Sequence, residues 1–394
     1  MIHINHLNEV LEAIEGRSEF KVKVDSENQI TIVNYMVELD DTFPDPNEEG
    51  ISRAEKRRRM ILRECRGITF CSETGAVISR KFHKFFNVGQ KEETRAHRVD
   101  FSKPHVIMEK LDGSMITPLW RNNKIIWCSK MGETFLTPIV NQFVQKRPEY
   151  EQIAQTFIDN NITPMFEFCS RQQRIVIDYP EDRLVLLAAR YNDSGEYLPY
   201  SELCQVAHHH GVDVVRALPG SVGNILTFLE ETRGLSGQEG WVIAFDDGTR
   251  LKVKAEEYII AHRAKDSLAH EKNVLYLVAS DTIDDVLPVL PEADQERVRR
   301  YATDVSQAMI SVAEEVRLTV EAYADTDQRT FALEVAPRFS GQIQSLLFKV
   351  RAGKASAFDA VRDTVKNKCG SQAAVDSVRD LIGGVQWTYS AVED

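Results

Sequence analysis

The segment EKLDGS, residues 109–114, carries the strongest chemical signal in this chain and follows a strand-like run that begins at Val106. A lysine acts as a nucleophile only when part of its population is deprotonated, which requires burial or neighbouring cations. The Asp-Gly-Ser sequence after Lys110 favours a tight turn, in which Gly113 leaves room for a ligand. The alternative that this segment alone leaves open is an exposed turn with a solvated lysine.

Three more polar segments lie on strand-like runs downstream of this turn: FEF at 166–168, EGWV at 239–242 and KVK at 252–254. Successive side chains of a strand point to opposite faces. Lys252 and Lys254 are therefore expected to project together, as a pair that binds one phosphate group would. The same alternation places Glu167 on the opposite face from its two phenylalanine neighbours. A second lysine beside Lys110 is expected to lower the pKa of Lys110.

The first 265 residues read as a mixture of strands and helices. Residues 21–24 and 29–33 alternate around a turn-forming segment, which is the pattern of a β-hairpin. Strand-like runs also cover 67–70, 106–109, 124–128, 165–168, 174–177, 184–189, 240–245 and 250–254, and helical patterns cover 136–160, 200–210 and 222–233. This order predicts an α+β domain built on antiparallel sheets, not a regular βαβ array.

Strand-like runs end after about Ala264, and apolar residues then recur three and four positions apart. We therefore predict two domains, 1–265 and 266–394, of which the second is helical. Within the second domain, 266–334 holds 15 acidic and 6 basic residues, whereas 338–379 holds 8 basic and 3 acidic residues. If this domain binds nucleic acid, the basic stretch is the expected contact.

Composition agrees with an ordinary globular protein, since 43% of the 394 residues are hydrophobic and 27% are charged. The net charge of −12 hides a basic segment, because 51–110 contains 15 Lys/Arg and only 7 Asp/Glu. Such a segment in an acidic protein is expected where one face binds phosphate. For its densest run, at 56–59, a solvated helix face is the simpler interpretation.

The chain has no apolar run long enough to cross a bilayer, and its first residues lack the pattern of a signal peptide. Its six cysteines show no Cys-x-x-Cys pair and no zinc-like spacing. We therefore expect reduced cysteines in a cytoplasmic protein that does not bind a membrane.

Taken in order, these segments resemble the motifs of the covalent nucleotidyltransferases, which are polynucleotide ligases and RNA capping enzymes. The segment at Lys110 looks like motif I, 166–168 like motif III, 239–240 like motif IV and 252–254 like motif V. The closer likeness is to the RNA ligase 1 family of T-even-like phages and covers nearly the whole chain. Elements similar to that family also stand at 65–68, 84–87, 129–130, 174–176, Tyr258 and 344–347.

This resemblance implies a nucleotidyltransferase (ATP-grasp-like ligase) domain with a phosphate-binding subregion at 1–100, followed by a helical domain that selects the RNA substrate. It implies that Lys110 attacks the α-phosphate of ATP and keeps AMP. AMP then passes to the 5′-phosphate of an RNA, and a 3′-hydroxyl displaces it. The implied cofactor is Mg²⁺, or Mn²⁺ in its place. The implied substrate is single-stranded RNA or an RNA broken in a loop, such as a tRNA under repair.

The resemblance also supplies the candidate site. Lys110 is the expected nucleophile. The residues expected to bind ATP are Arg66, Lys84, Glu109, Glu167, Glu239, Lys252, Lys254 and Tyr35, and the accessory residues are Lys130, Phe166 and Tyr258. The basic members are the expected phosphate clamps. Glu167 and Glu239 are carboxylates near the metal, and Glu167 equally suits a ribose hydroxyl. Tyr35, or Val33 in its place, is the candidate aromatic residue of the nucleotide pocket.

Other functions remain open. A DNA ligase or an mRNA guanylyltransferase of the same superfamily is the first alternative, although both usually carry an OB-fold after motif V, where this chain turns helical. A non-catalytic RNA-binding relative is the second, although such a protein is expected to have lost a motif lysine. We further expect a monomer, located in the host cytoplasm if a phage encodes it.

Two clusters resemble metal sites. Residues 208–210 are consecutive histidines, whose side chains point in different directions on a helix, so an exposed helix end is the favoured interpretation. Asp281, with Asp284 and Asp285, is a candidate metal ligand at the start of the helical domain, and a capped helix start is the favoured alternative. For Trp241, the strand alternation predicts a core position.

Overall fold

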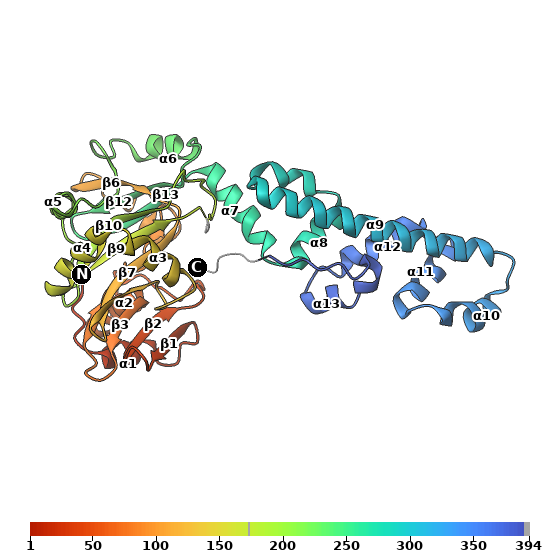
Figure 1. Ribbon diagram of the computed structural model, residues 1–394, viewed down its shortest axis with the longest axis horizontal. Helices are drawn as coiled ribbons and strands as arrows, with labels where there is room; N and C mark the ends of the chain where they lie inside the picture. Colours follow the sequence, from red (N-terminus) through yellow and green to blue (C-terminus); the bar gives the residue numbers. More distant parts are fainter. Residues whose placement is uncertain (172–173, 390–394) are drawn as a thin grey trace. The chain divides into compact units, whose positions relative to one another are not determined.

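The computed structural model describes residues 1–171 and 174–389, and the chain divides into two compact units after Tyr258. Unit 1 contains sheets and helices, whereas unit 2 is helical in its described part (Figure 1). The α+β class and the helical C-terminal part are thus confirmed. The predicted boundary near Lys265 falls inside helix α7 (Glu256–Leu268), in which the two units meet.

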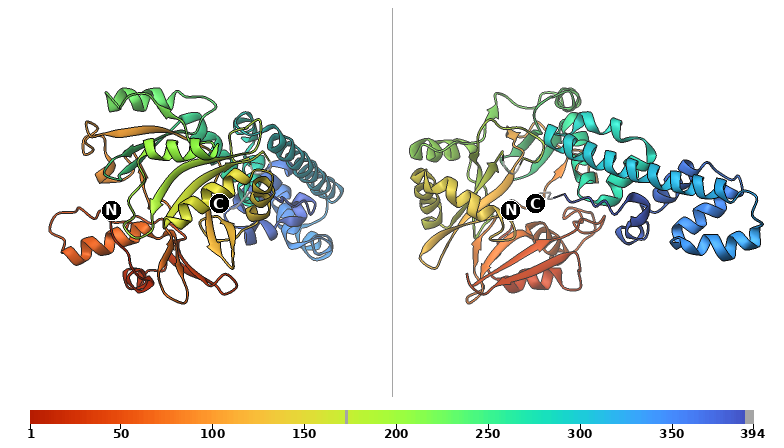
Figure 2. Two further views of the ribbon diagram at one scale, coloured as in Figure 1. Left: turned by 60° about the vertical axis from the view of Figure 1, so that its left-hand side comes forward. Right: turned by 45° about the vertical axis from the view of Figure 1, so that its right-hand side comes forward.

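The described part of unit 1 forms three sheets (Figures 1 and 2). The first has the order β1 (Phe20–Asp25), β2 (Ile30–Tyr35), β3 (Arg66–Cys71), β4 (Val77–Ser79). The second has the order β10 (Arg183–Tyr191), β9 (Ile162–Cys169), β7 (Ser114–Arg121), β8 (Lys124–Cys128). The third has the order β11 (Ala217–Leu218), β6 (His105–Lys110), β12 (Gly240–Phe245), β13 (Arg250–Lys254), β5 (Phe86–Asn87). Pairing within these sheets is antiparallel except between β13 and β5.

The helices of unit 1 are α1 (Leu7–Ile14), α2 (Arg53–Glu64), α3 (Leu136–Gln145), α4 (Pro148–Asp159), α5 (Tyr200–His210) and α6 (Ile225–Arg233). The helical pattern predicted at 136–160 is confirmed, and the segment forms two helices because Pro148 begins the second. Proline has no amide hydrogen to donate and disfavours helical backbone in the residue before it, so it suits the first position of a helix. The histidines at 208–210 end α5, as predicted.

The prediction of a strand at 174–177 is wrong. This segment forms bends, and the amides of Val176 and Ile177 each donate to Oδ2 of Asp112 at 2.7 Å. The backbone groups that a strand would offer to a neighbour are thus bound to a carboxylate. The run of β-branched apolar residues in this segment therefore did not lead to a strand.

The third sheet lies between two apolar layers. On one face, Trp241 and Ile243 pack with Phe228 and Leu229 of α6. On the other face, Met108 packs with residues of the second sheet. Trp241 is 7% exposed, which confirms its predicted core position. Both faces of this sheet are therefore apolar along most of their length.

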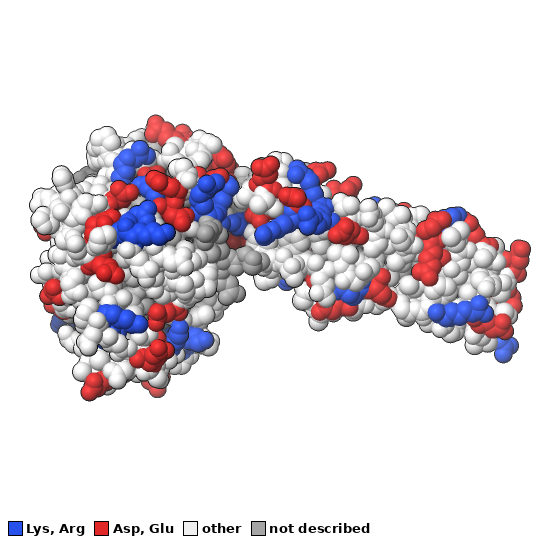
Figure 3. All heavy atoms as spheres, viewed as in Figure 1, with Lys and Arg blue, Asp and Glu red and all other residues white. Residues whose placement is uncertain are grey.

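The basic run at 56–59 lies on α2. Arg57 pairs with Glu9, and Arg59 pairs with Glu48 and with Glu55, the last at 2.8 Å. On the face shown in Figure 3, Lys and Arg side chains are interspersed with Asp and Glu rather than gathered in one basic surface. This arrangement agrees with the solvated helix face favoured for the run.

Unit 2 continues from α7 through α8 (Glu271–Ser280), α9 (Glu292–Ala322), α10 (Gln328–Thr330), α11 (Gly341–Arg351), α12 (Ala357–Asn367) and α13 (Gln372–Asp376). Short helical turns at 283–285, 287–289, 331–338 and 379–382 connect them. The buried carboxylate of Glu271 accepts bonds from Tyr301, Gln372, Arg379 and the amide of Trp387, and so ties distant parts of the unit together. No helix in the described ranges is long and apolar enough to span a bilayer.

Asp281 does not begin a helix. It ends α8, with its backbone in the left-handed region at φ 57°, so the favoured prediction of a capped helix start is wrong for this residue. Aspartate and asparagine tolerate this conformation better than most residues because a short polar side chain can bond locally. Asp281 is thus placed at a helix end in unit 2. All the other predicted site residues lie in unit 1.

Candidate active site

Three neighbouring strands bring the predicted lysines together. Gly240 of β12 stands opposite Lys110 of β6 on one side and opposite Lys254 of β13 on the other. Gly240 has φ 140°, and a Cβ at this position would lie 2.0 Å from the carbonyl oxygen of Val253. Only glycine lets the strands approach in this way.

Glu239 lies between the two lysines. Its Oε1 is 2.7 Å from Nζ of Lys110 and 3.0 Å from Nζ of Lys254, and its side chain is 3% exposed. Burial by itself would raise the pKa of Glu239, but the two ammonium groups hold that pKa below its ordinary value. Glu239 is therefore a buried carboxylate that is ionised and shared by two lysines.

The pKa of Lys110 is raised, not lowered. Burial lowers it, but the carboxylates of Glu239, Glu167 and Asp112 outweigh that effect and favour the ammonium form. The prediction that a neighbouring lysine lowers the pKa of Lys110 is thus wrong for this arrangement. Lys110 must separate from Glu239 before its amine can act as a nucleophile.

Lys252 is the lysine whose pKa falls. Burial is the main cause, and the cations Lys110, Lys84, Arg66 and Lys254 add to it, so that the pKa of Lys252 drops to about 7. Its Nζ lies 5.3 Å from the centre of the Phe85 ring. Lys252 and Lys254 share one face of β13, as predicted. The residues that alternate with them, Leu251 and Val253, are buried on the other face.

Asp112 organises the loop that follows Lys110. Besides binding the amides of Val176 and Ile177, its carboxylate accepts a bond of 2.7 Å from the Tyr258 hydroxyl. Its own amide donates to the Tyr179 hydroxyl at 2.9 Å. From the sequence, Asp112 was expected only to form part of the turn after Lys110. The hydroxyl of Tyr258, 146 positions further along the chain, gave no local signal of this contact.

Gly113 lies against the backbone of β9. A Cβ at this position would lie 2.5 Å from the carbonyl oxygen of Phe168 and 3.1 Å from Cγ of Glu167. Glycine is thus required for close approach to β9. The same contact places Glu167 beside the loop that follows Lys110. Phe166 and Phe168 are buried on the opposite face of β9, which confirms the predicted alternation.

The upstream residues approach from the first sheet. Lys84 is buried, pairs with Glu38, and has its Nζ at 4.9, 5.5 and 5.3 Å from the ring centres of Tyr35, Phe43 and Phe86. Tyr35 packs edge-on against Phe43 at 5.1 Å. The structure thus places the candidate aromatic residue against a predicted phosphate-binding lysine. Its alternative, Val33, is fully buried in the core.

The backbone of Gly67, the residue after Arg66, lies close to the backbone of Lys130. Arg66 begins β3, and Gly67 follows it with φ 80°. A Cβ on Gly67 would lie 2.4 Å from the carbonyl oxygen of Lys130. The amine of Lys81 donates to the carbonyl oxygen of Gly67 at 2.6 Å, and its burial lowers the pKa of Lys81 to about 8. Sequence analysis did not identify Lys81 as part of this region.

Two predicted site residues lie apart from this group. The side chain of Glu109 points away from that of its strand neighbour Lys110 and has its Oε2 3.7 Å from Nε of Arg216. Asp281 belongs to unit 2, as described above. No set of three or more His, Cys, Asp or Glu within residues 1–171 and 174–389 is arranged to hold a metal ion by itself.

A buried ionic cluster supports the upstream elements. Arg190 binds both carboxylate oxygens of Glu64, at 2.9 and 3.0 Å, and Arg80 binds the same carboxylate at 3.2 Å. All three side chains are buried. Burial would raise the pKa of Glu64, but the two guanidinium groups hold it far below its usual range. The cluster joins α2, the segment that leads to Lys84, and β10.

Comparisons with known proteins found similar sequences that are described as RNA ligases. A family model described as RNA ligase matches residues 64–259. A "Putative RNA ligase" of Thermovibrio ammonificans is 29% identical over 79% of this chain and 79% of its own length. RNA ligase 1 of bacteriophage TS2126 is 26% identical over 72% of this chain and 69% of its own length. A solved archaeal ATP-dependent RNA ligase is 14% identical, with a TM-score of 0.45 over 66% of this chain and 64% of that one.

The family match begins before Arg66 and ends after Tyr258, so it contains Lys110, the shared carboxylate of Glu239 and the lysines of β13. The match to this chain spans more than two thirds of the length of each of the two relatives. These matches support the RNA ligase 1 family as the family that this chain resembles.

Proposed function

We propose that this chain joins RNA ends in an ATP-dependent reaction that passes through an AMP group bonded to Lys110. The observation that carries the proposal is the grouping of Lys110, Glu239 and Lys254 on three adjacent strand ends. A nucleophilic lysine with a proton acceptor and further cations at hand is what transfer of a nucleotidyl group to an amine requires.

The bonds change in three steps. The Lys110 amine attacks the α-phosphorus of ATP, so that an N–P bond forms, pyrophosphate leaves and the nitrogen gives up a proton. The 5′-phosphate of RNA then attacks the same phosphorus, which breaks the N–P bond and forms an RNA-adenylate. In the last step, a 3′-hydroxyl attacks the RNA 5′-phosphorus, loses its proton, and releases AMP from the new phosphodiester.

Glu239 controls the first step through the Lys110 proton. The ion pair at 2.7 Å keeps Lys110 in the ammonium form, which has no lone pair for attack. Glu239 and Glu167 also suit a divalent cation of the Mg²⁺ type, which binds through one or two carboxylates together with substrate phosphates. Such a cation supplies positive charge to phosphate oxygens when it is bound. Glu239 would then have a partner other than Lys110, and Lys110 could lose its proton.

The remaining cations suit the phosphates of ATP. Lys252 and Lys254 project from one face of β13, and Arg66 and Lys84 act electrostatically on Lys252 from the first sheet and the segment after it. These cations repel the Lys252 ammonium and so add to the effect of burial, which is the main cause of its lowered pKa. A triphosphate is the kind of anion that relieves this repulsion.

ATP binding should weaken as the pH rises through about 7. Lys252 has a lowered pKa of about 7, so its positive charge is present below that pH and lost above it. A phosphate clamp works only with the charged form. Calorimetry from about pH 6 to about pH 8.5 covers roughly one unit or more on each side of that pKa. The measured affinity for ATP should fall across this range. Lys252→Arg should remove the pH dependence, because arginine stays charged. A dependence that persists in Lys252→Arg would assign it to another group.

The reaction itself is tested with α-labelled ATP and Mg²⁺, followed by a single-stranded RNA that carries a 5′-phosphate and a 3′-hydroxyl. The label should remain on the denatured protein, then leave as AMP while the RNA is sealed. Labelled GTP and a nicked DNA duplex in parallel reactions separate this proposal from a guanylyltransferase and a DNA ligase. A protein that takes no label from ATP would contradict the proposal and leave a non-catalytic RNA-binding protein.

Finer expectations remain predictions. These are the preference for Mg²⁺ over Mn²⁺, a broken tRNA loop as the natural substrate in RNA repair, a monomeric enzyme in the cytoplasm, and a role of unit 2 in choosing the RNA. The charge of the basic stretch at 338–379 and the helical character of unit 2 support the last of these.

A further inference from the structure

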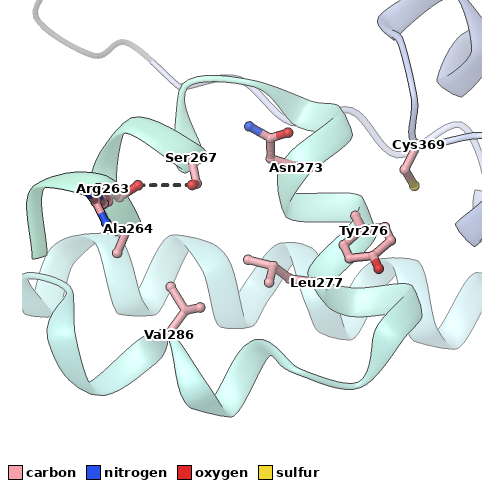
Figure 4. A pocket seen from close by; sticks show the side chains of 8 residues that line it. All are labelled: Arg263, Ala264, Ser267, Asn273, Tyr276, Leu277, Val286 and Cys369. Atoms are coloured by element: carbon pink, nitrogen blue, oxygen red, sulfur yellow. Dashed lines mark hydrogen bonds between the residues drawn. The ribbon is translucent and has the colours of Figure 1, made fainter. Parts of the chain in front are cut away.

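Unit 2 contains a pocket that the reaction proposed above does not use. Its walls come from α7 and α8, with Val286 and Cys369 completing it, and its volume is about 360 Å³ (Figure 4). Ligand sites in proteins commonly have volumes of roughly 300–1,000 Å³. The pocket is therefore large enough for one small ligand or for one unit of a polymer.

The wall from α8 offers groups that suit a nucleobase. Tyr276 is 47% exposed, so its ring is accessible to solvent, and Asn273 lies one turn before it on the same helix (Figure 4). An aromatic ring provides a stacking surface for a base. A side-chain amide provides both a hydrogen-bond donor and an acceptor for a base edge.

The charges around the pocket suit a phosphate. Arg263 lines it from α7, and Nζ of Lys366 lies 5.6 Å from the centre of the Tyr276 ring. None of the eight residues that line the pocket is acidic. On the two helices that line the pocket, Asp266 pairs with His262 on α7, and Glu271 of α8 pairs with Arg379.

Not all basic residues of the stretch at 338–379 are available to bind RNA. Arg351 donates to the backbone carbonyls of Tyr323 and Thr326, and Arg379 holds the buried Glu271. These two arginines contribute to the internal structure of unit 2. Lys366 is the member of this stretch that lies over the ring of a pocket residue.

We propose that this pocket binds one unpaired nucleotide of the RNA substrate, with its base against Tyr276 and Asn273 and its phosphate at Arg263. The inference rests on the proposed function, because an RNA substrate is what makes a nucleotide the expected occupant. A base in this position would hold the strand by a contact independent of base pairing. It would give unit 2 a direct part in RNA binding.

The first test measures the affinity of the full-length protein for a dye-labelled, 5′-phosphorylated oligouridylate by fluorescence anisotropy. Tyr276→Ala should weaken binding by about 5- to 150-fold, the range that corresponds to loss of one base–aromatic stack. Tyr276→Phe keeps the ring and should bind like the original protein. Phe358→Ala is the matched control, because Phe358 is also an exposed aromatic residue of unit 2 with a cation near its ring (Arg362, at 5.9 Å) but does not line the pocket.

The second test examines the phosphate contact through salt dependence. Arg263→Gln should reduce the slope of log Kd against log salt concentration by about 0.7, the value for one phosphate contact to a single strand. Arg300→Gln, on the exposed face of α9 and paired with Glu296, should leave the slope unchanged. Competition with free AMP separates a polymer site from a nucleotide site, and excess AMP should not displace the RNA.

A third measurement locates the base directly. An oligouridylate containing 4-thiouridine should cross-link to residues of α7 or α8. All variants should still take AMP from labelled ATP onto Lys110, so a failure of the proposed reaction is recorded separately from a failure of RNA binding. Equal affinity of Tyr276→Ala and the original protein, cross-links confined to other elements, displacement by AMP, or no RNA binding by the original protein would each overturn the inference.

Discussion

Replacing Lys110 with alanine should reduce the transfer of AMP from ATP to the protein to below detection. The amine is the only group of this residue that can form the N–P bond, and alanine has none. The fold should survive the change. Lys110 is 22% exposed, and Glu239, which would otherwise be a buried carboxylate without a counter-charge, keeps its 3.0 Å pair with Lys254. The measurement is label retained on the denatured protein after incubation with α-labelled ATP, beside a thermal unfolding curve.

Lys110→Arg should fail as well, because arginine keeps the positive charge but does not deprotonate in proteins. Lys124→Ala is the matched control, since Lys124 is an exposed lysine at the start of β8. It should take label at the normal rate. Label that survives denaturation in the Lys110→Ala protein would show that another residue is the nucleophile.

Lys252→Ala and Lys254→Ala should each slow the formation of the enzyme–AMP adduct by about 100- to 1,000-fold, the usual cost of removing one group that stabilises charge in a transition state. The two changes act differently. Lys252→Ala removes a cation that other cations surround, whereas Lys254→Ala leaves Glu239 paired with Lys110 alone. Lys254→Ala should therefore also shift the pH dependence of adduct formation to higher pH, because Glu239 then favours the Lys110 ammonium form more strongly.

Ser129→Ala is the control for these two variants. The Ser129 hydroxyl donates to the carbonyl oxygen of Gly132 at 3.3 Å within a turn, and its loss should change the rate little. Single-turnover measurements at saturating ATP separate the chemical step from binding. A lysine variant that forms the adduct at a near-normal rate would exclude that lysine from the phosphate clamp.

Much of unit 1 could be predicted because its signals are local. Alternation along β9 and β13 placed Glu167 opposite two phenylalanines and placed Lys252 and Lys254 together, and the structure agrees. A period of two in a strand depends only on neighbouring residues. The change to helical periodicity in unit 2 is local in the same sense. The segment at 174–177 shows the limit, because its backbone amides bind a carboxylate from a distant part of the chain.

The tertiary structure decided which charges meet. The pKa of Lys110 is raised because Glu239 and Glu167 approach it from distant parts of the chain, whereas the pKa of Lys252 is lowered mainly by burial and further by four nearby cations. A pKa shift depends on the summed field and burial at one point, which no short stretch of sequence contains.

By itself, the sequence determined the order of the motifs, the identity of the nucleophile as a prediction, and the class of each part of the chain, because residue type and spacing are sufficient for these. The roles of Asp112, Gly113 and Gly240 were decided only in three dimensions, since each depends on a backbone or side chain brought close by folding. The same holds for the Glu64–Arg80–Arg190 cluster, whose members are far apart in the chain. Burial makes such contacts obligatory, because an unpaired charge inside the protein costs more than the fold can tolerate.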